Sequence, residues 1–226
     1  MSFNNRDPRV GWIDDAITVP TWLDPLRTNV RGVPVSALTR FTPPAQGGRH
    51  SAVLILLGNN EFAPDLLLIE RAHTMRAHAG QPAFPGGARD DSDRDTRQTA
   101  LREAQEETGL DPAGVSTFGS LPDLWVPVSG YIVTPILGWW HQPCPVSVVD
   151  TDEVASVHRV PISELADPAN RLQVRHPSGY VGMGFRVRGL LVWGFTAGIV
   201  SGLLDLGGWA QPWDRERLEN LDGGAA

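Results

Sequence analysis

This chain of 226 residues contains no lysine and a single cysteine. All nineteen of its Lys-plus-Arg positions are therefore arginine, whose planar guanidinium favours two-pronged contacts with phosphate and carboxylate groups. Cys144 has no second cysteine with which to pair, which excludes an intrachain disulfide and is typical of a reducing compartment. The first residues also lack the basic-then-apolar pattern of a secretion signal, so we expect a cytoplasmic protein.

Long apolar runs and an excess of basic charge are absent as well. Residues 190–204 form the longest apolar stretch, but glycine and serine interrupt it, and it is shorter than the ~20 residues of a membrane-spanning helix. The stretch predicts a buried helix near the C-terminus. The net charge of −7 argues against a general nucleic-acid binder. Neither a membrane nor nucleic acid is therefore an expected partner. The sequence leaves the oligomeric state open, a homodimer included.

The order of predicted elements indicates an α/β (α+β) fold in which a mixed β-sheet is sandwiched between helices. Strands are expected at residues 51–57, 66–70, 115–121, 131–139, 154–160, 172–175 and 181–187, and helices at 21–29, at 96–108, after 161 and at 189–206. The first two strands should form a hairpin, and Phe84–Gly87 a tight loop. The chain then divides into an N-terminal extension and connector at 1–48, a main domain at 49–206 and a polar tail at 207–226.

The predicted helix at 96–108 carries three glutamates close together. Glu103 and Glu107 are one turn apart, and Glu106 lies three positions from Glu103. At about 100° per residue, the three carboxylates occupy an arc of about 100° on one face of the helix. Because like charges on one face repel each other, a bound cation is the obvious compensation. Ligands that are all oxygen favour Mg²⁺ or Mn²⁺ over Zn²⁺, so the sequence predicts a site for one of these ions.

Residues 87–110 resemble the Nudix box, a motif of the form G-x5-E-x7-R-E-U-x-E-E-x-G-U in which U is aliphatic. The positions that match in spacing and type are Arg102, Glu103, Glu106, Glu107, Gly109 and Leu110. The upstream half departs from the motif, because Asp93 stands in place of its glutamate and eight residues rather than seven separate Asp93 from Arg102. Whether Asp93 orients Arg102 is therefore open. A surface helix with solvated glutamates is the alternative, but it does not account for the glycines at both ends of the motif.

The preceding segment, residues 67–87, is similar to the signature of the coenzyme A pyrophosphatase branch of the Nudix superfamily, L-L-T-x-R-[SA]-x3-R-x3-G-x3-F-P-G-G. The matching positions are Leu67, Leu68, Arg71, Ala72, Arg76, Gly80 and Phe84–Gly87, whereas Ile69 replaces the threonine. That branch also tends to carry an aspartate and an extra residue in the upstream half of its box. The resemblance implies a Nudix-like fold and hydrolysis of coenzyme A, or its derivatives, to 3′,5′-ADP and 4′-phosphopantetheine. It also implies that Arg71, Arg76, Gly80 and Phe84 contact the substrate.

Arginine and histidine beside an acidic metal site suit a substrate with several phosphates. Metal ions would bind the bridging oxygens, while the guanidinium groups of Arg71 and Arg76 would hold the remaining charge. Other nucleotides meet the same description, so the chemistry alone does not single out coenzyme A. Solvated or salt-bridged arginines are the alternative at both positions, and His73 and His78 are more often ordinary surface histidines.

Three further roles complete the predicted site. Gly87 corresponds to a glycine whose carbonyl often binds metal in Nudix enzymes, with a plain turn as the alternative. Arg102 is expected to orient the carboxylates and keep them ionised, since a neighbouring cation favours the charged form. Glu103 or Glu153 is expected to accept the proton of the attacking water, although Glu153 can also be a solvated loop residue. Two other functions stay open: hydrolysis of another nucleoside diphosphate derivative such as ADP-ribose or a dinucleotide, and non-catalytic nucleotide binding.

Overall fold

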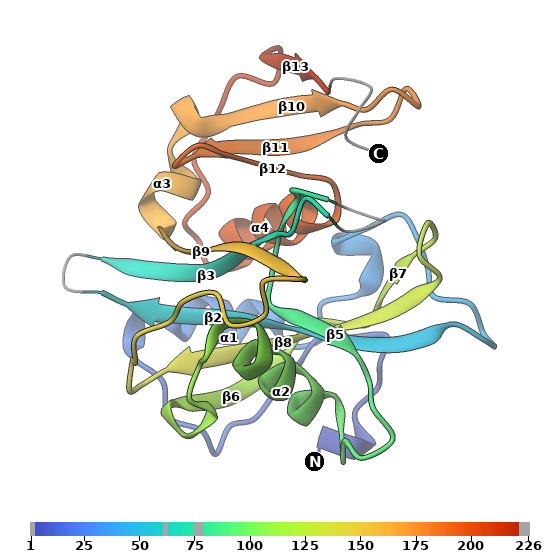
Figure 1. Ribbon diagram of the computed structural model, residues 1–226, viewed down its shortest axis with the longest axis vertical. Coiled ribbons are helices and arrows are strands. Elements are labelled where there is room, and N and C mark those ends of the chain that lie inside the picture. The colour runs from blue at the N-terminus through green and yellow to red at the C-terminus, as the bar shows by residue number, and fades with distance from the viewer. Residues whose placement is uncertain (1–2, 61–62, 75–78, 222–226) are drawn as a thin grey trace.

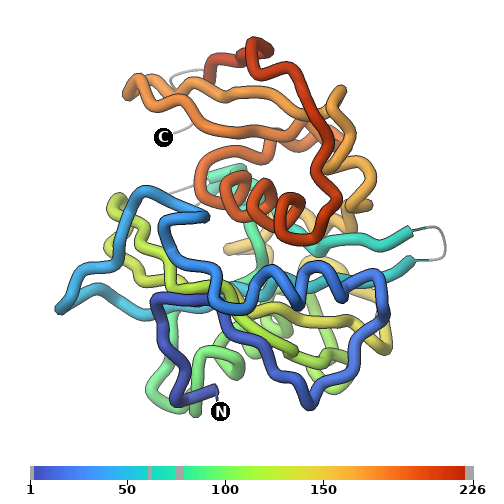
Figure 2. The backbone as a smooth tube through the Cα atoms, turned by 180° about the vertical axis from the view of Figure 1, so that it is seen from behind, coloured from blue at the N-terminus to red at the C-terminus, as the bar shows by residue number. Residues whose placement is uncertain are grey.

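The computed structural model describes residues 3–60, 63–74 and 79–221. It contains a nine-stranded sheet and a four-stranded sheet, with helix α4 (Gly194–Leu206) between them (Figure 1). Helix α1 (Asp24–Val30) lies beside α4, as Figure 2 shows from behind. Helix α2 (Thr96–Thr108) covers the opposite face of the larger sheet. The predicted class, a mixed sheet between helices, is confirmed for the larger sheet, and the second sheet is additional to the prediction.

The centre of the nine-stranded sheet is formed by long strands. The nine strands of the whole sheet are β1 (Trp12–Ile13), β2 (Arg49–Asn59), β3 (Pro64–Arg71), β4 (Pro82–Ala83), β5 (Gly86–Ala88), β6 (Val115–Ser120), β7 (Leu124–Val126), β8 (Tyr131–Trp140) and β9 (Val154–Pro161). β2 runs parallel to β8 and antiparallel to β3, which confirms the predicted hairpin. β9 pairs with β3, β6 with β8 and β5 with β2, all antiparallel. This topology places strand β5 next to helix α2, so the two sequence motifs meet in space.

Apolar side chains that alternate in direction along β2 contribute to the hydrophobic core on both faces of the sheet. Leu54 and Leu56 face a buried cluster that includes Ala100 and Ala104 of α2. The intervening Ile55 faces a second cluster, which includes residues of α1 and α4. Successive side chains of a strand point to opposite faces, so one strand can hold helices on both sides. The two alanines let α2 approach the sheet closely, and this holds the glutamates of the helix against β5.

Helix α2 begins and ends where its sequence indicates. The Asp95 side chain caps its N-terminus by accepting hydrogen bonds from the backbone amides of Arg97 at 3.0 Å and Gln98 at 3.1 Å. At the other end Gly109 has φ of 69°, a left-handed conformation that glycine adopts without steric cost. The helix therefore has the predicted bounds, and all three glutamates of the box lie on it.

The four-stranded sheet corrects the prediction for the C-terminal region. Its strands are β10 (Arg171–Arg175), β11 (Val181–Val187), β12 (Leu190–Trp193) and β13 (Leu218–Asn220). The expected helix at 189–206 begins only at Gly194, because the four residues before it pair with β11 as strand β12. An apolar run by itself does not distinguish a buried strand from a buried helix. The strands predicted at 172–175 and 181–187 are present as β10 and β11, and they pair with each other.

Both terminal regions contribute to the packed fold. In the N-terminal region, Leu23, Leu26 and Val30 are fully buried, and β1 pairs with β6. In the C-terminal region, β13 pairs in parallel with β10, and Trp209 packs on the core. Residues on both sides of the predicted division at 48 and 206 therefore pack in the fold.

The predicted tight loop at Phe84–Gly87 is wrong in its second half, which belongs to strand β5. Gly86 pairs with Val53 of β2, and Gly87 pairs with Ala52. A Cβ atom at Gly86 would lie 2.6 Å from the Cα of Val53, so the close approach of the two strands requires glycine.

The remaining helical elements are short. They are α3 (Ile162–Ala166), at the predicted position, and the 3₁₀ turns Phe3–Asn5, Thr21–Leu23, Val35–Ala37, Pro112–Gly114 and Pro168–Asn170. Within the described ranges, no helix has the length and apolar character needed to cross a membrane.

Candidate active site

Glu107 lies where α2 contacts β5 and is only 2 % exposed. Its Oε2 accepts a hydrogen bond from the backbone amide of Gly86 at 2.9 Å, whereas its Oε1 is buried without a hydrogen-bond partner. Burial disfavours the charged form and raises the pKa of Glu107 to about 8, although the Gly86 amide and the charge of Arg71 oppose this shift. A buried carboxylate oxygen without a donor is costly, so this atom is suited to a ligand that supplies positive charge.

The carboxylate of Glu103 rests against the backbone of Gly87. A Cβ atom at position 87 would lie 2.5 Å from both Cδ and Oε2 of Glu103, so only glycine leaves room for this carboxylate. Burial is the main cause of a raised pKa of Glu103; the charge of Arg102 opposes the shift, and the charges of Glu106 and Glu153 add to it. Glu103 is therefore a partly desolvated carboxylate among other carboxylates.

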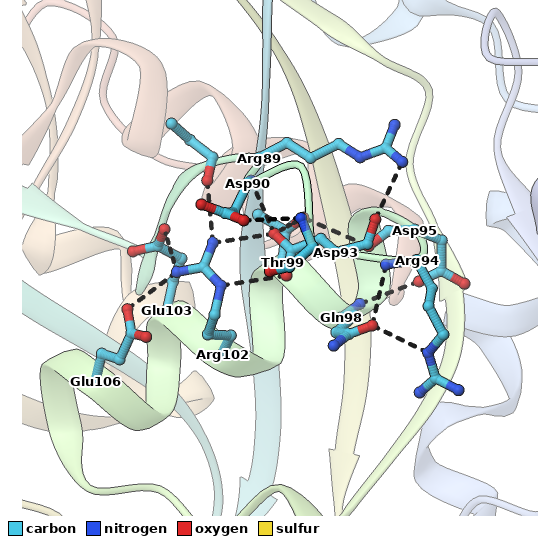
Figure 3. A network of polar contacts seen from close by, with 12 residues as sticks. Arg89, Asp90, Asp93, Arg94, Asp95, Gln98, Thr99, Arg102, Glu103 and Glu106 are labelled. Atoms are coloured by element: carbon cyan, nitrogen blue, oxygen red, sulfur yellow. Dashed lines mark hydrogen bonds and ion pairs between the residues drawn. The ribbon is translucent and has the colours of Figure 1, made fainter.

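Arg102 is the centre of a polar network that joins α2 to the loop before it (Figure 3). Its guanidinium lies 2.9 Å from Oε1 of Glu103 and 3.0 Å from Oε2 of Glu106. The same group donates a hydrogen bond to the carbonyl oxygen of Ala88, at the end of β5, at 3.1 Å. A hydrogen bond to Asp93 is the largest of the effects that raise the pKa of Arg102. The contacts that its predicted orienting role requires are thus present.

Asp93 is the other fixed end of this network. The Oδ2 atom of its fully buried carboxylate accepts hydrogen bonds from the hydroxyl of Thr99 at 2.9 Å and from the amide of Asp90 at 3.0 Å. The hydrogen bonds from Arg102 are the largest cause of its lowered pKa. The aspartate side chain, shorter than the glutamate of the motif, still reaches Arg102 when one more residue separates the two. The sequence left open whether Asp93 binds Arg102, and the structure shows that it does.

Arg71 and Glu153 come together at neighbouring ends of β3 and β9. The amide of Ala72 donates to the carbonyl oxygen of Glu153 at 2.8 Å. The charge of Arg71 lowers the pKa of Glu107, and the charge of Glu153 raises the pKa values of both Glu103 and Glu107. The Nε of Arg71 is buried without a hydrogen-bond partner, while Glu153 is exposed. Segments far apart in the sequence therefore place a guanidinium and a fourth carboxylate beside the helix glutamates.

The other predicted substrate-binding residues are Gly80, Phe84 and Arg76. Gly80 has φ of 67°, and its amide donates to the carbonyl oxygen of Arg71 at 3.0 Å, so it shapes the loop that follows β3. Phe84 is 3 % exposed and belongs to the buried cluster on the face of the sheet opposite α2. Its predicted contact with substrate is without structural support, and we assign its side chain to the core. Arg76 and His78 lie outside the described residues.

The donor set suits a hard divalent cation. The side-chain donors are carboxylate oxygens, the ligand class that Mg²⁺ and Mn²⁺ prefer. A cation would relieve both the unpartnered oxygen of Glu107 and the repulsion between Glu107 and Glu103. Among the residues that the structure describes, no three Asp, Glu, His or Cys side chains are already gathered as a metal-ligand set. Glu103, Glu106 and Glu107 would hold the ion from the helix, and Arg102 contacts the carboxylates of Glu103 and Glu106.

Comparison with known proteins shows the family of the chain. The family model described as the NUDIX domain matches residues 48–178, more than half of the chain. This chain belongs to the Nudix hydrolase family. Its relatives include the protein named uncharacterized Nudix hydrolase NudL of Cronobacter sakazakii, which is 42 % identical over 162 residues, or 69 % of this chain and 81 % of the relative. NudL of Citrobacter koseri is 43 % identical over the same length and shares.

The fold has a counterpart among solved structures. The crystal structure of RenU, a Nudix hydrolase from M. smegmatis, matches with a TM-score of 0.50 and 18 % identity, and the match covers 75 % of this chain and 92 % of that one. At this identity the likeness supports the fold alone. As a Nudix hydrolase, the chain is an enzyme for nucleoside diphosphate derivatives, in a family that generally uses divalent metal ions.

Sequence reasoning missed three groups of the site. The amide of Gly86, the hydroxyl of Thr99 and the amide of Asp90 each bind a carboxylate of the network. Their contacts depend on how β5 and the loop before α2 fold back on the helix. The only local sign of these contacts in the sequence was Thr99, in the first turns of α2, whose side chain could reach back to Asp93.

Proposed function

We propose that this Nudix hydrolase cleaves the diphosphate bond of coenzyme A or its derivatives, releasing 3′,5′-ADP and 4′-phosphopantetheine or its acyl form. One observation carries the proposal. Gly86, within the segment that resembles the coenzyme A pyrophosphatase signature, donates its backbone amide to Oε2 of Glu107 at 2.9 Å, and the charge of Arg71 in the same segment lowers the pKa of Glu107. This supports the proposal that the segment that distinguishes this branch and helix α2 form one site.

The charges of the site complement those of the substrate. Coenzyme A carries a diphosphate and a 3′-phosphate, so a binding site for it needs guanidinium groups as well as metal ligands. Arg71 has a buried Nε without a hydrogen-bond partner, which is a donor suited to a phosphate oxygen. Arg76 is proposed as the second phosphate-binding arginine, and Gly80 as the residue that shapes the loop between them and the box.

The carboxylates would take part in catalysis as metal ligands. Bound Mg²⁺ or Mn²⁺ would lower the pKa of the attacking water and neutralise charge on the phosphoryl oxygens. Glu103, Glu106 and Glu107 are the proposed side-chain ligands, with the carbonyl of Gly87 as a further one. Arg102 would keep Glu103 in place through its contact at 2.9 Å.

Glu103 is also the preferred general base. A base works best when its pKa lies near the working pH, and burial raises the pKa of Glu103 above its ordinary range. The exposed Glu153 is the second choice, because its charge reaches both Glu103 and Glu107. If kcat no longer rises with pH in Glu103→Gln but still does in Glu153→Gln, this would support the first assignment.

A substrate panel tests the reaction and its specificity. Coenzyme A, ADP-ribose and a dinucleotide would be incubated with the protein, with and without Mg²⁺ or Mn²⁺, and the products separated by chromatography. We expect 3′,5′-ADP and 4′-phosphopantetheine from coenzyme A at the highest rate, and no turnover without metal. Faster cleavage of ADP-ribose or the dinucleotide would support diphosphate hydrolysis but would show that coenzyme A is not the preferred substrate. Tight binding of coenzyme A without turnover in either metal would support a non-catalytic nucleotide-binding module instead.

Substitutions on the helix test the ligand assignment. Glu106→Gln and Glu107→Gln should each lower kcat by roughly 10²-fold or more, as the loss of a main electrostatic contribution does, while the fold stays intact. Glu216→Gln, which changes an exposed glutamate of the C-terminal region, is the matched control. Wild-type turnover by either helix variant at saturating Mg²⁺ would rule out the proposed ligands.

A further inference from the structure

We propose that the N-terminal segment of residues 3–13 braces helix α2, and that Phe3 is a positioning residue for Glu103 and Glu107. The segment lies outside residues 48–178, which the Nudix family model matches. In both overall views the N-terminal end lies beside the loop that leads into α2 (Figures 1 and 2). The catalytic consequence rests on the proposed function, whereas the mechanical contact does not.

Phe3 contacts the helix from the side of the hydrophobic core. It is 5 % exposed, and it belongs to the same buried cluster as Ala100 and Ala104 of α2. The guanidinium of Arg97, in the first turn of α2, lies over the Phe3 ring at 4.6 Å. Arg97 also pairs at 2.9 Å with Asp95, the residue that caps the helix. The ring is therefore connected to the start of the helix through both packing and a cation–π contact.

The same segment is fixed to the large sheet at its other end. Arg6, whose guanidinium also lies over the Phe3 ring at 5.2 Å, pairs with the carboxylate of Asp123. Asp123 in turn accepts a hydrogen bond from the hydroxyl of Thr134, in strand β8, at 2.8 Å. Trp12 packs edge-on against Phe3 at 5.3 Å and pairs with Ser120 of strand β6. Phe3 is thus held between the sheet and the helix, which is the arrangement a brace requires.

The braced face of α2 is the face that ends at Glu107. Ala100, Ala104 and Glu107 are all buried and stand at positions i, i+4 and i+7, which follow one stripe of a helix. At ~1.5 Å per residue, Glu107 lies about 10 Å along the axis from Ala100. A tilt of the helix at its N-terminal half would therefore move the carboxylate at its other end. A metal or catalytic constellation tolerates only about 0.5 Å of such displacement, so loss of the brace should affect the site before it unfolds the protein.

Substitutions in the full chain test the brace. Phe3→Ala removes the ring, and Phe3→Leu keeps apolar volume but removes the face on which the two guanidinium groups lie. Arg9→Ala is the matched control, because Arg9 belongs to the same segment, pairs with Asp7 and has a side chain that is 83 % exposed. The measurements are amide hydrogen exchange over residues 96–108, Mn²⁺ binding to the free protein by electron paramagnetic resonance, and kcat and KM for coenzyme A.

For Phe3→Ala we expect faster exchange over residues 96–108 with unchanged exchange over residues 181–187. We also expect weaker Mn²⁺ binding and a kcat lowered about 10-fold, with KM changed much less, because a displaced catalytic group affects turnover more than substrate binding. Phe3→Leu should lie between wild type and Phe3→Ala. It also provides the readout if the alanine variant does not fold.

Equal exchange and equal Mn²⁺ binding in Phe3→Ala and Arg9→Ala would overturn the brace. A wild-type protein that turns over none of the diphosphate substrates would overturn the proposed function, and the exchange and Mn²⁺ measurements would still decide whether the brace exists.

Discussion

Arg102 donates to both carboxylate oxygens of Asp93, with Nε–Oδ1 at 3.2 Å and Nη2–Oδ2 at 3.0 Å. The aspartate side chain is fully buried, whereas that of the arginine is 27 % exposed and reaches the surface beside Glu106. This two-pronged contact fixes the plane of the guanidinium, and through it the carboxylates of Glu103 and Glu106. The upstream half of the box thus keeps its structural purpose although its residue type and spacing differ from the motif.

Asp93→Asn should weaken both the fold and catalysis. The amide can still accept one hydrogen bond, but the charge that balances Arg102 is lost, so we expect the free energy of unfolding to fall by about 1–3 kcal/mol. The less constrained guanidinium should also lower kcat about 10-fold through misplacement of Glu103. Urea denaturation and initial rates with coenzyme A measure the two effects. Asp91→Asn, in the same loop but exposed, should change neither. A loss of stability with an unchanged rate would restrict Asp93 to a role in folding.

Gly87→Ala tests the fit between Glu103 and strand β5. The added methyl would fall 2.5 Å from Cδ of Glu103, so this carboxylate has to move away from β5. We expect kcat to fall by about 10-fold or more, with a cooperative thermal transition retained. Gly198→Ala is the matched control, because a Cβ there meets no atom within 4 Å and alanine favours helix α4 by up to about 1 kcal/mol. Full activity of Gly87→Ala would show that Glu103 needs no such close approach.

The sequence predicted the site best where spacing alone determines geometry. Glu103, Glu106 and Glu107 share a helix because Asp95 and Gly109 define its ends, and both signals are local. The position of Arg71 beside them followed from a motif match rather than from any local pattern.

Sequence reasoning failed where an element depends on a distant partner. Leu190–Trp193 has the composition of a buried helix or a buried strand, and only the neighbouring β11 decides in favour of the strand. Likewise, Gly86 belongs to β5 because Val53 lies opposite it. Phe84 is part of the motif match, but its burial in the core is a property of the folded sheet that no local pattern contains.

The raised pKa of Glu107 should make the stability of the metal-free protein depend on pH. An exposed glutamate in the unfolded chain titrates near its ordinary value of 4.5, whereas burial raises the pKa of Glu107 in the folded protein to about 8. Below the lower value both states are protonated, and the folded state carries no penalty from this group. As pH rises between the two values, the unfolded chain ionises while the folded protein keeps its proton, so the free energy of unfolding falls. The full effect is at most about 5 kcal/mol, and it levels off above the higher value.

Urea unfolding of wild type and Glu107→Gln in EDTA, at several values between pH 5 and pH 8, isolates this contribution, because the other titrating groups are common to both proteins. We expect wild type to lose stability relative to Glu107→Gln as pH rises. Mg²⁺ or Mn²⁺ should reverse the loss in wild type but not in the variant, since a cation favours the ionised carboxylate and its binding releases a proton. If the free energies of unfolding of the two proteins change in parallel with pH, Glu107 is ionised throughout this range. In that case the unpartnered Oε1 would need a compensating charge from the chain itself, and the burial of Glu107 would no longer favour a cation at this position.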